Sequence, residues 1–110
     1  MARRNLIDAI KSDNLLVDFL VAHRGKENVV SSSEIAEYLT NCGFPINAVS
    51  AGVKVKRVMV ERHLPICHFN THGYYWASNK AELRESILDL ENRIEAMQER
   101  IKHLKGFIID

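Results

Sequence analysis

The sequence has few cysteines, no long apolar run and no large net charge. Two cysteines, Cys42 and Cys67, are too few for a disulfide framework, so we expect free thiols in a reducing compartment. No apolar run approaches the ~20 residues needed to cross a bilayer. The basic N-terminus reaches Asp8 too soon to be a signal peptide. These absences predict a cytoplasmic protein without membrane contacts.

The charges nearly cancel, but they are unevenly distributed. Fifteen Lys and Arg against fourteen Asp and Glu give a net charge of +1. Residues 41–77 carry four Lys/Arg against one Glu, whereas residues 1–40 and 78–110 are each slightly acidic. A basic middle third is a first, weak indication of a polyanionic partner. At 110 residues the chain has room for one compact domain and an appendage.

The first clear helical pattern begins near Asp13. Asp13 is a candidate N-cap, and apolar residues at helical spacing continue to about His23, before Gly25 ends the helix. The apolar side chains of residues 1–12 are compatible with another helical turn or two. We therefore treat 1–12 as a separate N-terminal segment.

Two further helices follow. Ser31 and Glu34 have the spacing of a capping box ahead of a helix over residues 33–40. The next helix spans about residues 47–62, although its valines and Gly52 lower the intrinsic helix propensity. One side of this helix is apolar (Ala48, Ala51, Val55, Val58 and Met59), and a polar row on the opposite side predicts a solvent-exposed face (Ser50, Lys54, Arg57 and Glu61).

A β-hairpin follows the basic helix. Residues 65–69 and 74–77 read as two strands, with residues 70–73 as the turn between them. Val29 and Val30 form an additional short β-prone pair. Strand alternation places Tyr74 and Trp76 on one face and Tyr75 on the other, so packing is a better explanation for these rings than stacking on nucleic acid.

The strongest single signal lies in residues 78–110. Ser78 or Asn79 can cap a helix that continues to about Lys105. Apolar residues alternate at spacings of four and three along it, which defines a heptad seam (Leu83, Ile87, Leu90, Ile94, Met97, Ile101, Leu104 and Ile108). A stripe of this length exceeds what one small domain can cover, so the seam predicts self-association as a dimer or tetramer.

The orientation of the paired helices stays open at this point. Isoleucine at a and leucine at d favour a parallel dimer. In a parallel pair, however, Arg100 would meet Lys105 of the partner. An antiparallel pair centred on Gln98 would set Glu91 against Lys105 but also Arg93 against Arg100.

The order of the predicted elements, helix, short β segment, helix, basic helix and hairpin, resembles the winged helix-turn-helix domains of small phage and prophage regulators. In that family a segment like residues 33–39 is the first helix of the motif, and one like residues 55–61 belongs to the recognition helix. The most telling match is the wing, Leu64-Pro65-Ile66-Cys67 and then Gly73-Tyr74-Tyr75-Trp76-Ala77. The resemblance covers residues 13–77 and implies a mainly α fold with a small β-hairpin (α+β), followed by the coiled-coil helix.

The resemblance implies a homo-oligomeric protein that binds double-stranded DNA and regulates transcription or replication, in the host cytoplasm if it is phage-encoded. An α-helix fits the major groove, where Arg and Lys bind guanine, while hydroxyl groups and turn residues contact the backbone. The candidate DNA contacts lie at the start of one helix, on the polar row of the next and in the hairpin turn (Ser32, Ser33, Ser50, Lys54, Lys56, Arg57, Asn70, Thr71 and His72).

The sequence also bears on zinc binding, catalysis and protein docking. A zinc site is disfavoured because Cys67 and His68 are adjacent in a strand and point to opposite faces. No catalytic constellation or phosphate-cradling loop is apparent, so we expect neither an enzyme nor a cofactor. The main alternative is a winged-helix adaptor whose coiled coil docks another protein without DNA binding; the near-neutral charge and Glu61 favour it.

Overall fold

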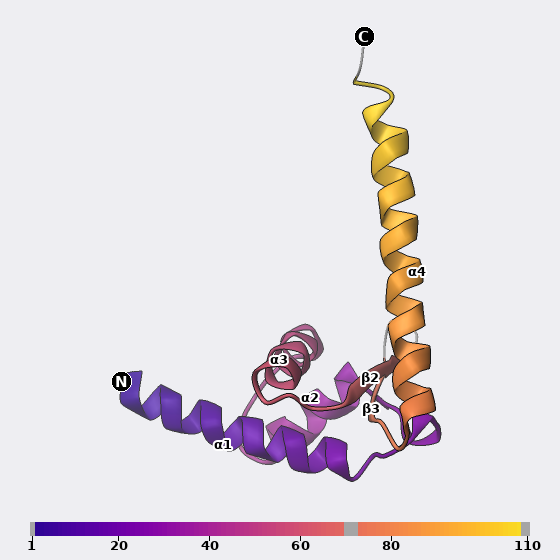
Figure 1. Ribbon diagram of the computed structural model, residues 1–110. Coiled ribbons are helices and arrows are strands. Elements are labelled where there is room, and N and C mark those ends of the chain that lie inside the picture. The colour runs from indigo at the N-terminus through magenta and orange to yellow at the C-terminus, as the bar shows by residue number, and fades with distance from the viewer. Residues whose placement is uncertain (1, 70–72, 109–110) are drawn as a thin grey trace.

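The computed structural model describes residues 2–69 and 73–108, with side chains from residue 6 onward. Figure 1 shows two parts: a head, formed by residues 2–77, and a single long helix that rises from one end of it. The longest dimension of the molecule is 55 Å. The protein is therefore mostly helical with one small antiparallel sheet, as the sequence predicts.

Helix α1 corrects the first boundary predicted from the sequence. It runs without interruption from Ala2 to Val21, so Asp13 lies inside the helix and does not cap it. The carboxylate of Asp13 instead bonds to cations on another helix, and both Ser12 and Asp13 are buried. The N-terminal half of α1 extends beyond the rest of the head (Figure 1) and leaves Leu6 and Ile10 exposed.

Helices α2 and α3 begin close to the predicted positions, and α2 begins at its predicted capping box. α2 spans Ser32–Asn41 behind a complete capping box formed by Ser31 and Glu34. α3 spans Ala48–Glu61, and its N-cap Asn47 accepts a hydrogen bond of 2.8 Å from the backbone N–H of Ser50. These local side-chain bonds satisfy amide groups that the first turn of a helix leaves unpaired.

The sheet has three strands in the order β1-β3-β2. Strands β2 (Ile66–Phe69) and β3 (Gly73–Trp76) form the predicted hairpin, in which Cys67 lies opposite Tyr75. The short strand β1 (Val30–Ser31) pairs with the other edge of β3. A 3-10 turn, η1 (Lys26–Asn28), joins α1 to β1.

One core holds the three helices of the head together. It combines Leu16 and Leu20 of α1 with apolar residues of α2, α3 and the sheet (Val30, Ile35, Ala36, Leu39, Ala51, Val55, Val58 and Tyr74). A smaller cluster of Cys67, Tyr75 and Ala77 lies on the other side of the sheet. Leu83, near the start of the long helix, packs against that cluster.

The long helix α4 spans Lys80–Lys105. Asn79 caps it by accepting a hydrogen bond of 2.9 Å from the backbone N–H of Glu82. No residue of α4 is fully buried. Over the described ranges, 2–69 and 73–108, no helix combines the length and apolar character needed to cross a membrane.

Candidate functional site

The polar row predicted on α3 is not a solvent-exposed face throughout. The ammonium of Lys54 lies 2.6 Å from the Asp13 carboxylate of α1, and the Lys54 side chain is only 13% exposed. Arg57 bonds the same carboxylate at 3.0 Å and also pairs with Glu61 at 2.9 Å. The prediction that Lys54 faces solvent is therefore wrong, because α1 covers that side of α3.

Asp13 is the centre of this ion-pair cluster. Arg62 completes it from the end of α3, at 3.9 Å from Asp13, and bonds Asn14 at 2.8 Å. Burial alone would raise the pKa of Asp13, but the hydrogen bonds from Arg57 and Lys54 hold it below its ordinary value of 3.8. The cluster therefore fixes α3 on α1, and the side chains of Lys54 and Arg57 are already engaged.

A different face of α3 points away from the core. We call it the outward row; it consists of Val49, Val53, Lys56 and Val60, at the helical spacing of four, three and four. The three valines are 80%, 64% and 67% exposed, and Lys56 is exposed as well. Ser50 is exposed beside them, as predicted. Any partner that approaches α3 from outside meets three methyl-rich side chains and one cation.

The start of α2 lies beside the start of α3. Residues 31–33 together with Ala48 and Val49 line a surface hollow of about 310 Å³. Ser33 is exposed there, whereas Ser32 is half-buried. Gly52 makes this close approach possible, because a side chain on it would lie 3.3 Å from the Ser32 hydroxyl and 3.2 Å from that of Tyr74. The predicted contacts Ser33, Ser50 and Lys56 therefore occupy one exposed side of the α2–α3 pair.

Replacing Ser31 by Ala is expected to destabilise the head by about 1 kcal/mol, because it removes the capping bond to the N–H of Glu34. Urea unfolding of the two variants Ser31→Ala and Ser33→Ala measures this. The exposed Ser33 makes no hydrogen bond that fixes the helix, so its loss should change the free energy of unfolding by less than about 0.5 kcal/mol. Equal effects in the two variants would contradict the capping role.

The aromatic residues of the β2–β3 hairpin serve packing. Tyr74 and Tyr75 are buried on opposite sides of the sheet, and Trp76 packs at the edge of the main core. The candidate DNA contacts Asn70, Thr71 and His72 lie outside the described residues. Among the side chains that the structure does describe, no group of three or more His, Cys, Asp or Glu residues could hold a metal ion.

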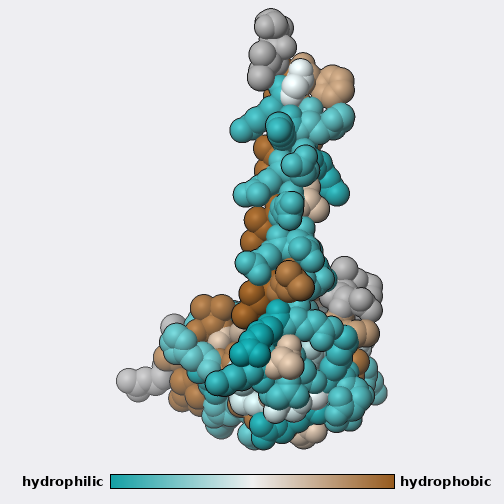
Figure 2. Space-filling view, turned by 45° about the vertical axis from the view of Figure 1, so that its right-hand side comes forward, coloured by the Kyte–Doolittle hydropathy of each residue, from teal (hydrophilic) through white to brown (hydrophobic). Residues whose placement is uncertain are grey.

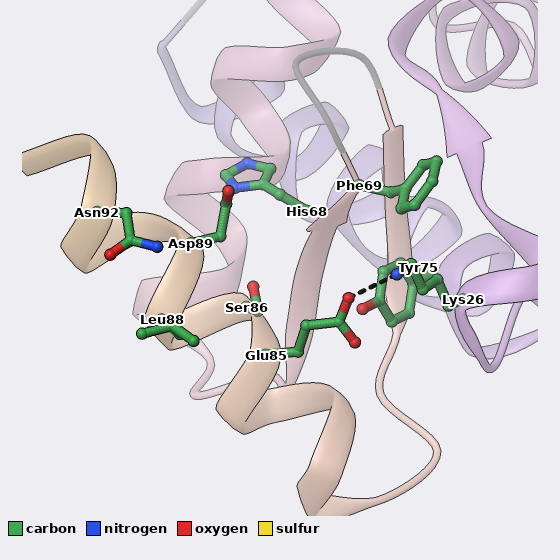
Figure 3. Close-up of a pocket in the computed structure, with 9 residues that line it drawn as sticks. All are labelled: Lys26, His68, Phe69, Tyr75, Glu85, Ser86, Leu88, Asp89 and Asn92. Carbon is green, nitrogen blue, oxygen red and sulfur yellow. Dashed lines mark hydrogen bonds and ion pairs between the residues drawn. The ribbon is translucent and has the colours of Figure 1, made fainter. Parts of the chain in front are cut away.

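Figure 3 shows the junction between the β2–β3 hairpin and α4, where a cavity of about 290 Å³ opens. Lys26 crosses it to pair with Glu85 of α4, and its ammonium lies 4.9 Å from the centroid of the Phe69 ring. The backbone N–H of Lys26 donates to Glu82 at 2.9 Å. These contacts attach the first turns of α4 to η1 and to the hairpin.

Burial also governs the titration of groups near this junction. It raises the pKa of the Cys67 thiol and of the Tyr75 phenol, and it lowers the pKa of His68 below the ordinary 6.5. The positive charges of Lys56 and Arg93 lower the pKa of His68 further, while Asp89 opposes them. Cys67 is thus a protonated packing residue rather than a reactive thiolate.

The heptad seam of α4 lies open along almost its whole length. Figure 2 shows it as a continuous apolar stripe on one side of the helix. Leu83 is half-buried against the head, and the other seven predicted seam residues are 42–79% exposed (Ile87, Leu90, Ile94, Met97, Ile101 and Leu104 on α4, and Ile108 in the turn after it). An apolar patch of this size is uncommon on a monomer and is typical of an interaction surface.

Comparison with known proteins found no matching family model, no similar curated protein and no similar solved structure. The candidate site is therefore defined by three structural features: the outward row on α3, the exposed hydroxyl groups beside it, and the seam on α4.

Sequence reasoning missed two features of this site. The role of Asp13 was hidden, since its position before an apolar run also fits an N-cap. The outward row was visible in principle, because Val49, Val53 and Val60 recur at helical spacing opposite Ala51, Val55 and Val58. The sequence does not say which of two apolar sides of a helix is buried.

Proposed function

We propose that this chain is a homo-oligomeric winged helix-turn-helix protein that binds double-stranded DNA and acts as a regulator of transcription or replication. The observation that carries the proposal is the connectivity of the head. Its elements follow the order α1-β1-α2-α3-β2-β3, and the strands pair as β1-β3-β2. That arrangement leaves the outer side of α3 uncovered, as a recognition helix requires.

The outward row of α3 would enter the major groove. Lys56 can bind a phosphate or a guanine edge, and Val49 and Val53 can contact the methyl groups of thymine. Ser33 and Ser50 stand beside the row, where their hydroxyl groups can donate to the DNA backbone. This assignment replaces Lys54 and Arg57 as the principal contacts, because both are engaged by Asp13.

A single head would bind DNA weakly. Lys56 is the one cation of the outward row, and affinity for duplex DNA rises with the number of phosphates that are neutralised. Joining two heads through α4 makes the second binding event intramolecular and raises the overall affinity, by about 10²–10⁴-fold where both sites can be engaged. Self-association is therefore part of the proposed mechanism.

Replacing Lys56 by Glu is expected to weaken binding to duplex DNA by at least about tenfold per head and to reduce the dependence on salt, because a phosphate contact becomes a repulsion. Fluorescence anisotropy with a labelled duplex at several salt concentrations measures both quantities. Lys102→Glu makes the same charge change on α4, far from α3, and should bind almost as the unmodified chain does. Equal losses in the two variants would reject α3 as the DNA-contacting helix.

The second candidate function is a protein adaptor, and the three exposed valines of the outward row favour it. The centres of protein interfaces are apolar and poor in charge, as this row is. A gel shift with genomic DNA fragments at low salt separates the two functions, since even non-specific DNA-binding proteins retard duplex under those conditions. Absence of any retardation would leave the adaptor as the better account.

A further inference from the structure

The free part of the seam begins above the head, not at the base of α4. Leu83, the first seam residue, already packs against the cluster of Cys67, Tyr75 and Ala77 in its own head. Ile87 and the later seam residues are exposed. A second helix therefore finds its open surface in the upper part of α4.

The direction of the seam limits how a second copy can approach. In Figure 1 the head extends to one side of α4, and in Figure 2 the apolar stripe runs along α4 above the wider part of the head. A partner helix packs about 8–10 Å from α4, so it must stand over the head. In a parallel pair the second head would have to share that same space, whereas in an antiparallel pair it lies beyond the far end of α4.

The charges beside the seam differ between the two orientations. In a parallel pair, Arg100 faces the second copy's Lys105 twice, and no flanking position brings opposite charges together. In an antiparallel pair centred near Glu99, Glu91 faces the second copy's Lys105 twice. In this register Arg93 lies two turns away from the second copy's Arg100, so the repulsion is reduced to one contact, between the two copies of Arg100 at the centre.

The same antiparallel register matches the apolar side chains. It sets Ile94 opposite Leu104 and Met97 opposite Ile101 of the second copy. Because α4 ends at Lys105, the second helix stops opposite Arg93, nearly two turns above Ile87, and leaves Leu83 to its own head. Charge, apolar pairing and the position of the head all favour the same orientation.

We propose that a second copy of this chain packs on the seam of α4 in the antiparallel orientation, with the two heads at opposite ends of the helix pair. This inference rests on the self-association proposed above. It places the two outward rows far apart, because the two helix bases at Lys80 are then separated by ~57 Å along the pair at 1.5 Å per residue.

Distances between spin labels on two chains test the orientation. Cys42 is replaced by Ser, because it is exposed, and a label is attached to Ala81→Cys in one sample and to Glu99→Cys in another. Both positions are exposed on α4. The antiparallel pair predicts more than about 50 Å between labels at position 81 and about 25 Å between labels at position 99.

The outcomes separate the orientation from self-association itself. Short distances at both positions would mean a parallel pair and would overturn this inference, while self-association would stand. Absence of any interchain distance at position 99 would overturn self-association, and the orientation with it.

Reversing the charge of residue 105 tests the orientation independently, because the dimer dissociation constant should rise in one orientation and fall in the other. Lys105→Glu should raise the dimer dissociation constant about three- to tenfold in the antiparallel pair, because two attractions with Glu91 become repulsions. In a parallel pair it would tighten the dimer, since Arg100 would gain an opposite charge.

The matched control is Lys102→Glu, which changes the same charge in the same last turn of α4 but lies off the seam flank. Sedimentation equilibrium measures each dissociation constant, and the swap Glu91→Lys with Lys105→Glu should restore that of the unmodified chain. A Lys105→Glu dimer as tight as the control would overturn the antiparallel orientation.

Discussion

Replacing Ile94 by Asp is expected to convert the chain to a monomer at micromolar concentration. The substitution acts on both copies, and each buried isoleucine contributes about 1.5–3 kcal/mol. Two such losses, together with two unpaired carboxylates in an apolar seam, raise the dimer dissociation constant by at least about 10²-fold. Sedimentation equilibrium should then give the 12.6 kDa mass of one chain.

The matched control for this change is Ala96→Asp, two residues further along and outside the heptad seam. It introduces the same charge into the same helix and costs only helix propensity, about 0.5 kcal/mol. The Ala96 variant should remain associated, whereas DNA affinity of the Ile94 variant should fall with its oligomeric state. A dimer that survives Ile94→Asp would mean that the seam is not the interface.

Replacing Asp13 by Ala is expected to destabilise the head by about 3 kcal/mol, because it leaves the largely buried ammonium of Lys54 without its partner. A loss of this size corresponds to a substantial part of the stability of a small domain. Thermal or urea unfolding measures it. Asp18→Ala, at an exposed position of the same helix, should change the stability by less than about 0.5 kcal/mol.

The Asp13 cluster also predicts how stability depends on pH. Because the pKa of Asp13 is lower in the folded than in the unfolded chain, its contribution is complete above the ordinary value of 3.8 and is lost as the pH falls below it. The difference in unfolding free energy between the unmodified chain and Asp13→Asn should therefore shrink below about pH 3.8. A constant difference down to pH 2 would contradict the role of the charged carboxylate.

Signals within a few residues of each helix start predicted where α2, α3 and α4 begin. Ser31, Asn47 and Asn79 cap the helices that the sequence indicated, because a cap bonds to residues two or three positions away and its partners lie in the same short stretch. The seam of α4 was equally readable, since its periodicity repeats along one helix. The aromatic residues of strands β2 and β3 and the turn between them were enough to predict the hairpin.

Contacts between residues far apart in the chain could not be predicted from neighbouring residues in the sequence. Asp13 precedes an apolar run as an N-cap would, but its partner Lys54 is forty-one residues away and lies on another helix. The helical spacing of Ser50, Lys54 and Arg57 identified a polar row correctly, yet it carried no information about α1 lying beside part of that row. How deeply a helical side chain is buried depends on which other elements pack against it, and that packing is known only from the folded structure.

Mass measurement of the complex with duplex DNA tests the central claim most directly. The unmodified chain is mixed with a duplex of about three helical turns at low salt, and sedimentation or native mass spectrometry gives the mass of the complex. Two linked heads predict one duplex with two chains, which adds twice the chain mass of 12.6 kDa. A duplex that stays free, or one that carries a single chain, would contradict the account.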